Sequence, residues 1–173
     1  MRVLGVDPGL TRCGVGVVEA QPGQRPRLVA VGVIKTSPEA DISKRLLRIH
    51  DDLRKWVAQT QPEQMAVERV FSQHNLNTVI QTAQAAGLAM LIAGQSGIPV
   101  AYHTPSEVKA AISGSGSANK DQVANMVTKI LGLGAPPQPA DAADAVAVAI
   151  CHLWRGSATN RLASAMGAEI YKA

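Results

Sequence analysis

Four acidic side chains of this 173-residue chain stand among apolar residues: Asp7, Glu68, Asp141 and Asp144. Asp7 ends the run VLGVD, Glu68 lies inside MAVERV, and the other two interrupt the alanine-rich run 140–150, which has no further charge. A carboxylate in such surroundings costs several kcal/mol unless it is paired, protonated or bound to a metal. Few cations are near in sequence, so a divalent metal ion is the favoured partner. Oxygen ligands alone suit Mg²⁺ or Mn²⁺ better than zinc.

The elements that must position these acids begin with three short β-rich runs. Residues 3–7, 15–20 and 28–36 are joined by short turns, which predicts an antiparallel meander. Residues 41–59 then change to a helical period with one apolar stripe. A fourth strand over residues 64–70 follows this helix, so we expect it to run parallel to the first strand.

The second half of the chain alternates helices with one more strand. The predicted elements are a strand over residues 98–102 and helices over 75–96, 105–114, 119–131 and 140–154. Thr104 and Glu107 form a capping box at the start of the second of these helices. The order βββαβαβααα predicts an α/β fold, with one mixed sheet and helices on both of its faces.

This fold brings the four acids together. Parallel first and fourth strands place Asp7 near Glu68, and sites in open α/β sheets lie beyond the carboxyl ends of strands. Asp141 and Asp144 are three residues apart, so they share one helix face. Taken alone, Asp7 also fits a turn residue before Pro-Gly, and Asp141 fits a helix N-terminal charge. The four together favour a metal site.

The sequence resembles the RuvC family of Holliday-junction resolvases, a branch of the ribonuclease H-like nucleases. Four motifs carry the resemblance in the right order: GVDPG at residues 5–9, AVERVF at 66–71, GSGSANK at 114–120 and ADAADA at 140–145. It covers residues 1–155, which we expect to form one ribonuclease H-like nuclease domain with a five-stranded sheet, three strands antiparallel and two parallel. Residues 156–173 are left as a C-terminal tail without a role, for which we expect disorder.

The resemblance implies a Mg²⁺-dependent endonuclease that resolves four-way DNA junctions by paired symmetric nicks, in homologous recombination and DNA repair. It also implies a homodimer that works with the RuvA–RuvB branch-migration complex. Asp7, Glu68, Asp141 and Asp144 resemble the family's catalytic, metal-binding quartet. These carboxylates would hold two Mg²⁺ ions about 4 Å apart, with Mn²⁺ as a substitute, one activating a water and one stabilising the leaving 3′ oxygen. We expect 5′ phosphate and 3′ hydroxyl ends.

Five further residues are expected to contact nucleic acid. Lys109 and Lys120 resemble the family's basic residues near the scissile phosphate, and Phe71 resembles its aromatic residue near the junction centre. Arg69 and His74 are expected to add phosphate contacts. From the residues alone, Lys109 also fits a solvated helix charge, and Phe71, the single Phe of the chain, also fits a core side chain.

Composition excludes several other classes. An apolar content of 46% excludes a disordered chain, and a net charge of +4 permits a nucleic-acid partner. Cys13 and Cys151 lack a CxxC spacing and fit buried apolar residues of a reducing cytoplasm. A carboxylate at position 7 argues against a signal peptide, and no apolar run reaches the about 18 residues of a membrane span. We therefore expect a cytoplasmic protein without membrane contact.

Other functions compete with junction resolution. The turn after Asp7 also resembles the phosphate-binding turn of actin-like ATPases and sugar kinases, but these need a second matching domain. A non-catalytic DNA-binding module leaves four embedded acids unexplained. An RNA-processing nuclease of the same fold is the remaining alternative. The apolar helix over residues 75–96 is the expected dimer interface, with packing inside the monomer as the competing interpretation.

Overall fold

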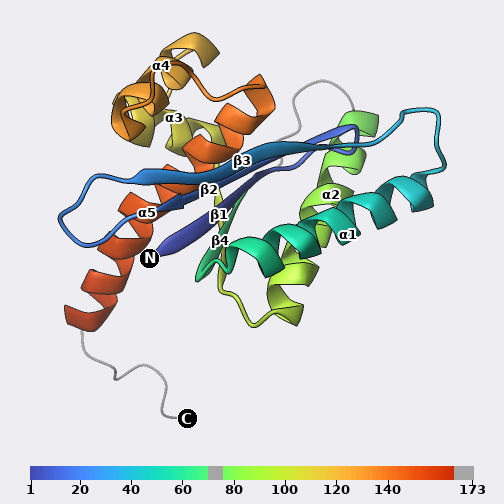
Figure 1. Ribbon diagram of the computed structural model, residues 1–173, viewed down its shortest axis with the longest axis horizontal. Helices are drawn as coiled ribbons and strands as arrows, with labels where there is room; N and C mark the ends of the chain where they lie inside the picture. The colour runs from blue at the N-terminus through green and yellow to red at the C-terminus, as the bar shows by residue number, and fades with distance from the viewer. Residues whose placement is uncertain (70–75, 166–173) are drawn as a thin grey trace.

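The chain folds around one five-stranded sheet in the order β3-β2-β1-β4-β5, in a computed structural model that describes residues 1–69 and 76–165 (Figure 1). Its strands are β1 (Arg2–Asp7), β2 (Arg12–Glu19), β3 (Arg27–Lys35), β4 (Gln64–Glu68) and β5 (Val100–His103). The first three pair antiparallel, and β4 and β5 are parallel to β1. The predicted mixed ribonuclease H-like sheet is confirmed.

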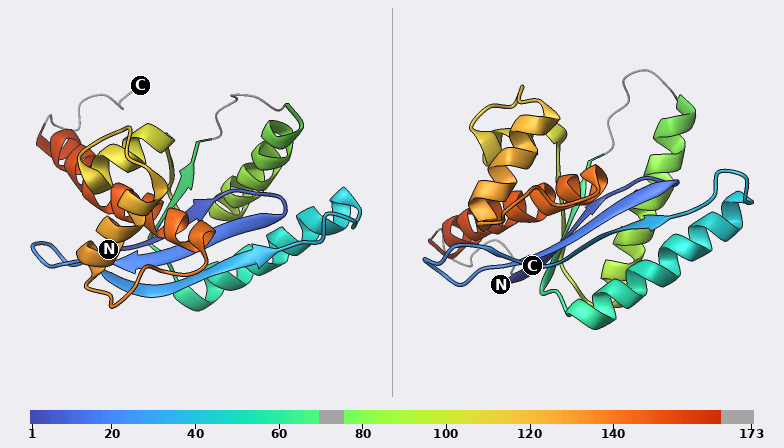
Figure 2. Two further views of the ribbon diagram at one scale, coloured as in Figure 1. Left: turned by 90° about the horizontal axis from the view of Figure 1, so that it is seen from above. Right: turned by 45° about the horizontal axis from the view of Figure 1, so that its top comes forward.

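Helices cover both faces of the sheet, as predicted (Figure 2). One layer holds α1 (Ile42–Thr60) and α2 (Leu76–Gln95), and the other holds α3 (Pro105–Ser113), α4 (Lys120–Leu131) and α5 (Ala140–Ala165). Each strand contributes side chains to both layers, because successive side chains of a strand point to opposite faces. Thus Leu4 packs with the first layer and Val3 with the second.

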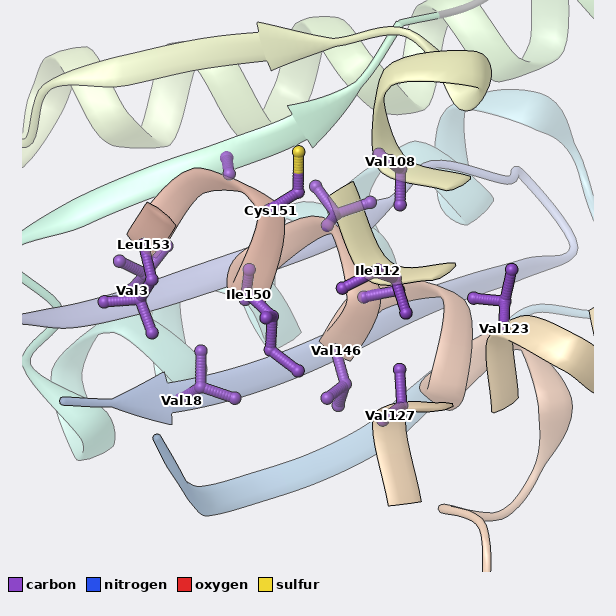
Figure 3. Close-up of a cluster of buried hydrophobic side chains, with 14 of the residues drawn as sticks. Val3, Val18, Val108, Ile112, Val123, Val127, Val146, Ile150, Cys151 and Leu153 are labelled. Atoms are coloured by element: carbon purple, nitrogen blue, oxygen red, sulfur yellow. The ribbon is translucent and has the colours of Figure 1, made fainter. Parts of the chain in front are cut away.

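The core of the second layer is built mainly from aliphatic side chains around α5 (Figure 3). Val146, Ile150 and Cys151 of this helix lie in one buried cluster with Val3 of the sheet and Val127 of α4. Small side chains let α5 lie close to the strands beneath it. That close approach brings the first turn of α5, with its two acids, to the sheet.

Glycines in the sheet make the approach possible. A Cβ atom at Gly5 would meet the carbonyl oxygen of Ala145, and one at Gly14 would meet the carbonyl oxygen of Asp141. A Cβ atom at Gly16 would meet the Cγ2 atom and the backbone nitrogen of Val146. Side chains at these positions would therefore push α5 away from β1 and β2.

Local signals fix the helix starts near the site. Thr104 and Glu107 form the predicted capping box, with Pro105 at the first position of α3. Asn119 and Gln122 form a second capping box at the start of α4. Gly114 ends α3 in the left-handed region, at φ 80°. The starts of α3 and α4 are thus each held by side-chain hydrogen bonds.

The end of the last helix differs from expectation. The predicted end at Trp154 is wrong, because α5 continues to Ala165. The disorder expected for residues 156–173 stays a prediction, and residues 166–173 lie outside the described residues. A Cβ at Gly156 would lie only 3.2 Å from the His152 ring, so this glycine serves close packing and does not stop the helix.

One described helix, α2, is long and apolar enough to cross a membrane by length and composition. Its buried face contains Ala85, Ala89 and Ile92, which pack in the cluster that α1 and the sheet share. A core helix of a globular domain has the same composition. The packing therefore explains the apolar character of this face without a membrane.

Two buried histidines join β5 to α5. His103 Nε2 lies 3.0 Å from His152 Nδ1, and His152 Nε2 lies 2.6 Å from Gln64 Oε1. This chain of contacts is satisfied when both rings are neutral, with His103 donating to His152 and His152 donating to Gln64. Burial lowers the pKa of both rings, that of His152 to about 4.

The histidine pair predicts a loss of stability in mild acid. The unfolded chain takes up protons near the ordinary histidine pKa of about 6.5, whereas the folded chain resists protonation down to about 4. The stabilising effect of neutral His152 is therefore full above pH 7 and is lost as the pH falls towards 4, by about 3 kcal/mol. In His152→Gln, which keeps a donor for Gln64, denaturant unfolding should lose this part of its pH dependence. Equal slopes for both proteins between pH 7 and 4 would refute the assignment.

Candidate metal centre

Asp7 and Glu68 end the two central parallel strands, next to one another. Val6 of β1 is in register with Val67 of β4, so the following residues meet at the same edge of the sheet. Burial raises the pKa of Asp7 to about 8, and the neighbouring charges of Glu68 and Asp144 add to this effect. Burial also raises the pKa of Glu68, which the hydrogen bond from Asp7 opposes. The two carboxyl groups thus share one proton, with Asp7 as the donor.

Asp141 and Asp144 enter the site from the first turn of α5. The carbonyl of Asp141 lies against Gly14, the β2 residue that pairs with Asp7. Asp144 is close enough to raise the pKa of both Asp7 and Glu68 by its charge. The structure therefore brings the predicted carboxylates of β1, β4 and α5 to one region.

Two cations neutralise the helix carboxylates. Lys120 Nζ lies 3.0 Å from Asp144 Oδ2, and this hydrogen bond raises the pKa of Lys120. Arg12 Nε lies 2.5 Å from Asp141 Oδ2. Lys109 is near enough to lower the pKa of Glu68 by its charge. Four acids and three bases thus form one compact electrostatic system.

An open cleft of about 580 Å³ leads to the carboxylates from the side of α2 and α3. Asp7, Glu68, Lys109 and residues of both helices line it, among them the hydroxyl-bearing Thr82 and Ser106. A second cavity of about 270 Å³ shares Asp7, Glu68 and Lys109 and continues to Lys120 and Asp144. A strand of nucleic acid laid in the first cleft would pass directly over the acids.

The five predicted nucleic-acid contacts have different outcomes. Lys109 and Lys120 lie beside the acids, and Arg69 lines the wide cleft with its guanidinium carbon 5.8 Å from the centre of the Tyr102 ring. Phe71 and His74 lie outside the described residues, so their roles stay predictions.

Arg12 is the site residue that sequence reasoning missed. It follows the turn after Asp7 and opens β2, and the β1–β2 hairpin returns it to the edge of the sheet where Asp7 ends. Because the hairpin was predicted, a basic residue five positions after Asp7 could have been expected near the site. Its contact with Asp141, 129 residues away, had no signal in the sequence.

The donor set fits a divalent metal ion. Within residues 1–69 and 76–165, no three Asp, Glu, His or Cys side chains are already grouped in ligand geometry. Arg12 and Lys120 instead pair with the two acids of α5, and a proton occupies the Asp7–Glu68 pair. Carboxylates that hold a proton near neutral pH because of burial and of neighbouring negative charges are stabilised when a divalent cation replaces that proton. Hard oxygen donors match the preference of Mg²⁺ and Mn²⁺.

Comparison with known proteins identifies the family of this chain. The family model described as "Crossover junction endodeoxyribonuclease RuvC" matches residues 3–152. The protein of that name from Cutibacterium acnes is 64% identical over 97% of this chain and 86% of its own length. The one from Streptomyces avermitilis is 58% identical over 99% of this chain and 98% of its own.

Solved structures give the same result. T. thermophilus RuvC in complex with a Holliday junction substrate superposes with a TM-score of 0.87 at 36% identity, covering 92% of this chain and 96% of that one. The yeast mitochondrial Holliday junction resolvase Ydc2, at 11% identity and a TM-score of 0.63 over 91% of this chain and 82% of its own, shares the fold. A family model that matches most of the chain and relatives above half identity settle the assignment. This chain belongs to the RuvC family.

Proposed function

We propose that this chain is a divalent-metal-dependent endonuclease that resolves four-way DNA junctions by paired, symmetric nicks. The observation that carries the proposal is the meeting of Asp7, Glu68 and Asp144 at two cavities with lysines on their walls, with Asp141 in the same first turn of α5. Family membership supports the substrate, since a relative of the same fold is known in complex with a Holliday junction. The process served is homologous recombination and DNA repair, in the cytoplasm.

The metal ligands would be Asp7, Glu68, Asp141 and Asp144. Two bound Mg²⁺ ions, with Mn²⁺ as a substitute, supply a nucleophilic water at neutral pH and stabilise the leaving 3′ oxygen. Asp7 must give up its shared proton before it can act as a ligand. Its raised pKa means that this proton competes with the metal ion, so metal binding should strengthen as the pH rises towards 8.

Lys109 and Lys120 would contact the phosphate of the substrate. Lys120 has a side chain 75% exposed and is held to Asp144 by one contact, so it is free to turn to a phosphate once Asp144 binds metal. Lys109 lines both cavities and faces any phosphate that spans them. Positive groups fixed at this place stabilise the charge that develops on the phosphate during hydrolysis. Arg69 extends the positive wall. Phe71 stays the residue expected near the junction centre, and His74 stays an expected phosphate contact.

A homodimer is part of the proposal. Exposed apolar side chains of α2 and β5 include Ile80, Met90, Leu91, Val100 and Tyr102. The Tyr102 hydroxyl contacts the Met90 sulfur, so α2 and β5 meet at this pair of exposed side chains. Two copies joined there by a two-fold axis would offer two sites to the two symmetric strands of a junction. The RuvA–RuvB complex is the expected partner in branch migration.

Matched substrates test the proposal in one experiment. Purified protein with Mg²⁺ is given a four-way DNA junction, a linear duplex of the same sequence and an RNA–DNA hybrid at equal strand concentration. We expect cleavage of the junction alone, and no cleavage when a chelator removes the metal. Preferred cleavage of the hybrid would establish the RNA-processing alternative and refute junction resolution.

A further inference from the structure

Arg12 contacts the site from a different element than the lysines. It opens β2 beyond the GVDPG motif, while Lys109 and Lys120 belong to α3 and α4. Its Nε lies 2.5 Å from Asp141 Oδ2, with side chains that are 42% and 29% exposed. This half-exposed arginine thus reaches from β2 to α5 and holds one carboxylate oxygen there.

The backbone that carries Arg12 is held by a buried network. Arg45 of α1, 7% exposed, donates from Nη2 to Thr11 Oγ1 at 2.7 Å and from Nε to Thr36 Oγ1 at 2.9 Å. Thr36 Oγ1 donates to the carbonyl oxygen of Leu10 at 2.6 Å, and Thr36 N donates to the carbonyl oxygen of Thr11 at 3.0 Å. The residues just before Arg12 are thus tied to β3 and α1.

The backbone of Asp141 is fixed as well. Its carbonyl lies against Gly14 of β2, which leaves no room for a Cβ atom there. The remaining freedom of Asp141 is the rotation of its side chain. The guanidinium of Arg12 limits this rotation, because a planar donor on a fixed strand fixes the direction of the carboxylate that it binds.

We propose that Arg12 is a positioning residue that holds the Asp141 carboxylate in the orientation needed to bind the divalent cation. The inference rests on the proposed function, in which Asp141 is a metal ligand. Ligating carboxylates are themselves held by hydrogen bonds, and loss of such a partner typically costs about 10–100-fold in metal affinity. Arg12 differs in this positioning role from Lys120. The exposed side chain of Lys120 would leave Asp144 and contact a phosphate.

Metal binding without DNA tests the inference. Mn²⁺ titrations followed by electron paramagnetic resonance are made on the full chain, on Arg12→Ala and Arg12→Lys, and on Arg27→Ala as a control. Arg27 also opens a strand and pairs with an acid, Glu19, away from the site. We expect about 10–100-fold weaker Mn²⁺ binding in Arg12→Ala, a smaller loss in Arg12→Lys and no change in Arg27→Ala.

The cleavage readout separates positioning from general damage. The Mn²⁺ concentration that gives half-maximal junction cleavage should rise in Arg12→Ala, while the rate at saturating Mn²⁺ should recover towards that of the unchanged protein. Unchanged or tighter Mn²⁺ binding in Arg12→Ala would overturn the inference, since Arg12 would then be neutral or a competitor of the metal. If Arg12→Ala does not fold, Arg12→Lys decides the question by the same two measurements. Absence of Mn²⁺ binding by the unchanged chain would instead refute the proposed function.

Discussion

Asp7→Asn should lower the single-turnover rate of junction cleavage by at least about 100-fold and leave junction binding intact. Burial and the neighbouring carboxylates raise the pKa of Asp7 to about 8, which favours its protonated form beside Glu68. Asparagine copies this protonated form, with an N–H donor in the same place, but has no proton to exchange for a metal ion. The variant therefore keeps the fold and the cationic cleft and loses a ligand. Cleavage in Mg²⁺ and gel-shift binding without metal measure the two properties.

The control for this change is Asp51→Asn, the same substitution at an exposed acid of α1. It should cleave and bind as the unchanged protein does. Wild-type cleavage by Asp7→Asn would remove Asp7 from the metal site. A parallel loss of junction binding would show that Asp7 acts in the fold or in DNA contact.

Gly14→Ala should damage both the fold and the site through one added methyl group. That group would collide with the carbonyl oxygen of Asp141 and lie 3.3 Å from the Asp7 Cβ, so the first turn of α5 must move away from the sheet. Overpacking of this kind costs about 1–3 kcal/mol of stability. A displacement of about 1 Å between the acids of α5 and Asp7 would lower cleavage by about 100-fold.

Gly134→Ala is the matched control, because a Cβ at Gly134 meets nothing within 4 Å. Thermal unfolding and single-turnover cleavage are measured for both variants at a temperature where both are folded. If Gly14→Ala cleaves and unfolds like the control, then the close approach of α5 to β2 does not position the acids.

Much of the fold and the carboxylate set could be predicted because the signals are local. Strand runs alternate with helical stripes, and Thr104 with Glu107 marks a helix start wherever it occurs. An acidic residue inside an apolar run can likewise be recognised from the sequence alone. Parallel pairing of β1 and β4 followed from the helix between them, and this pairing brought Asp7 to Glu68.

Contacts between distant segments could not be predicted in this way. Asp141 meets Arg12 because α5 crosses β2 on glycines, and neither the crossing nor the rotation of the helix is encoded in a local pattern. The His103–His152 pair likewise depends on where α5 passes β5. The predicted helix end at residue 154 was wrong, and Gly156 packs against the His152 ring inside a longer helix.

Strand-by-strand mapping of the nicks tests junction resolution most directly. A four-way junction is labelled in turn on each of its four strands and incubated with stoichiometric protein and Mg²⁺. We predict nicks at the same position on two opposite strands, both made within the lifetime of one complex, with 5′ phosphate and 3′ hydroxyl ends. Unpaired nicks on single strands, or equal cutting of the linear duplex, would contradict paired resolution by this chain.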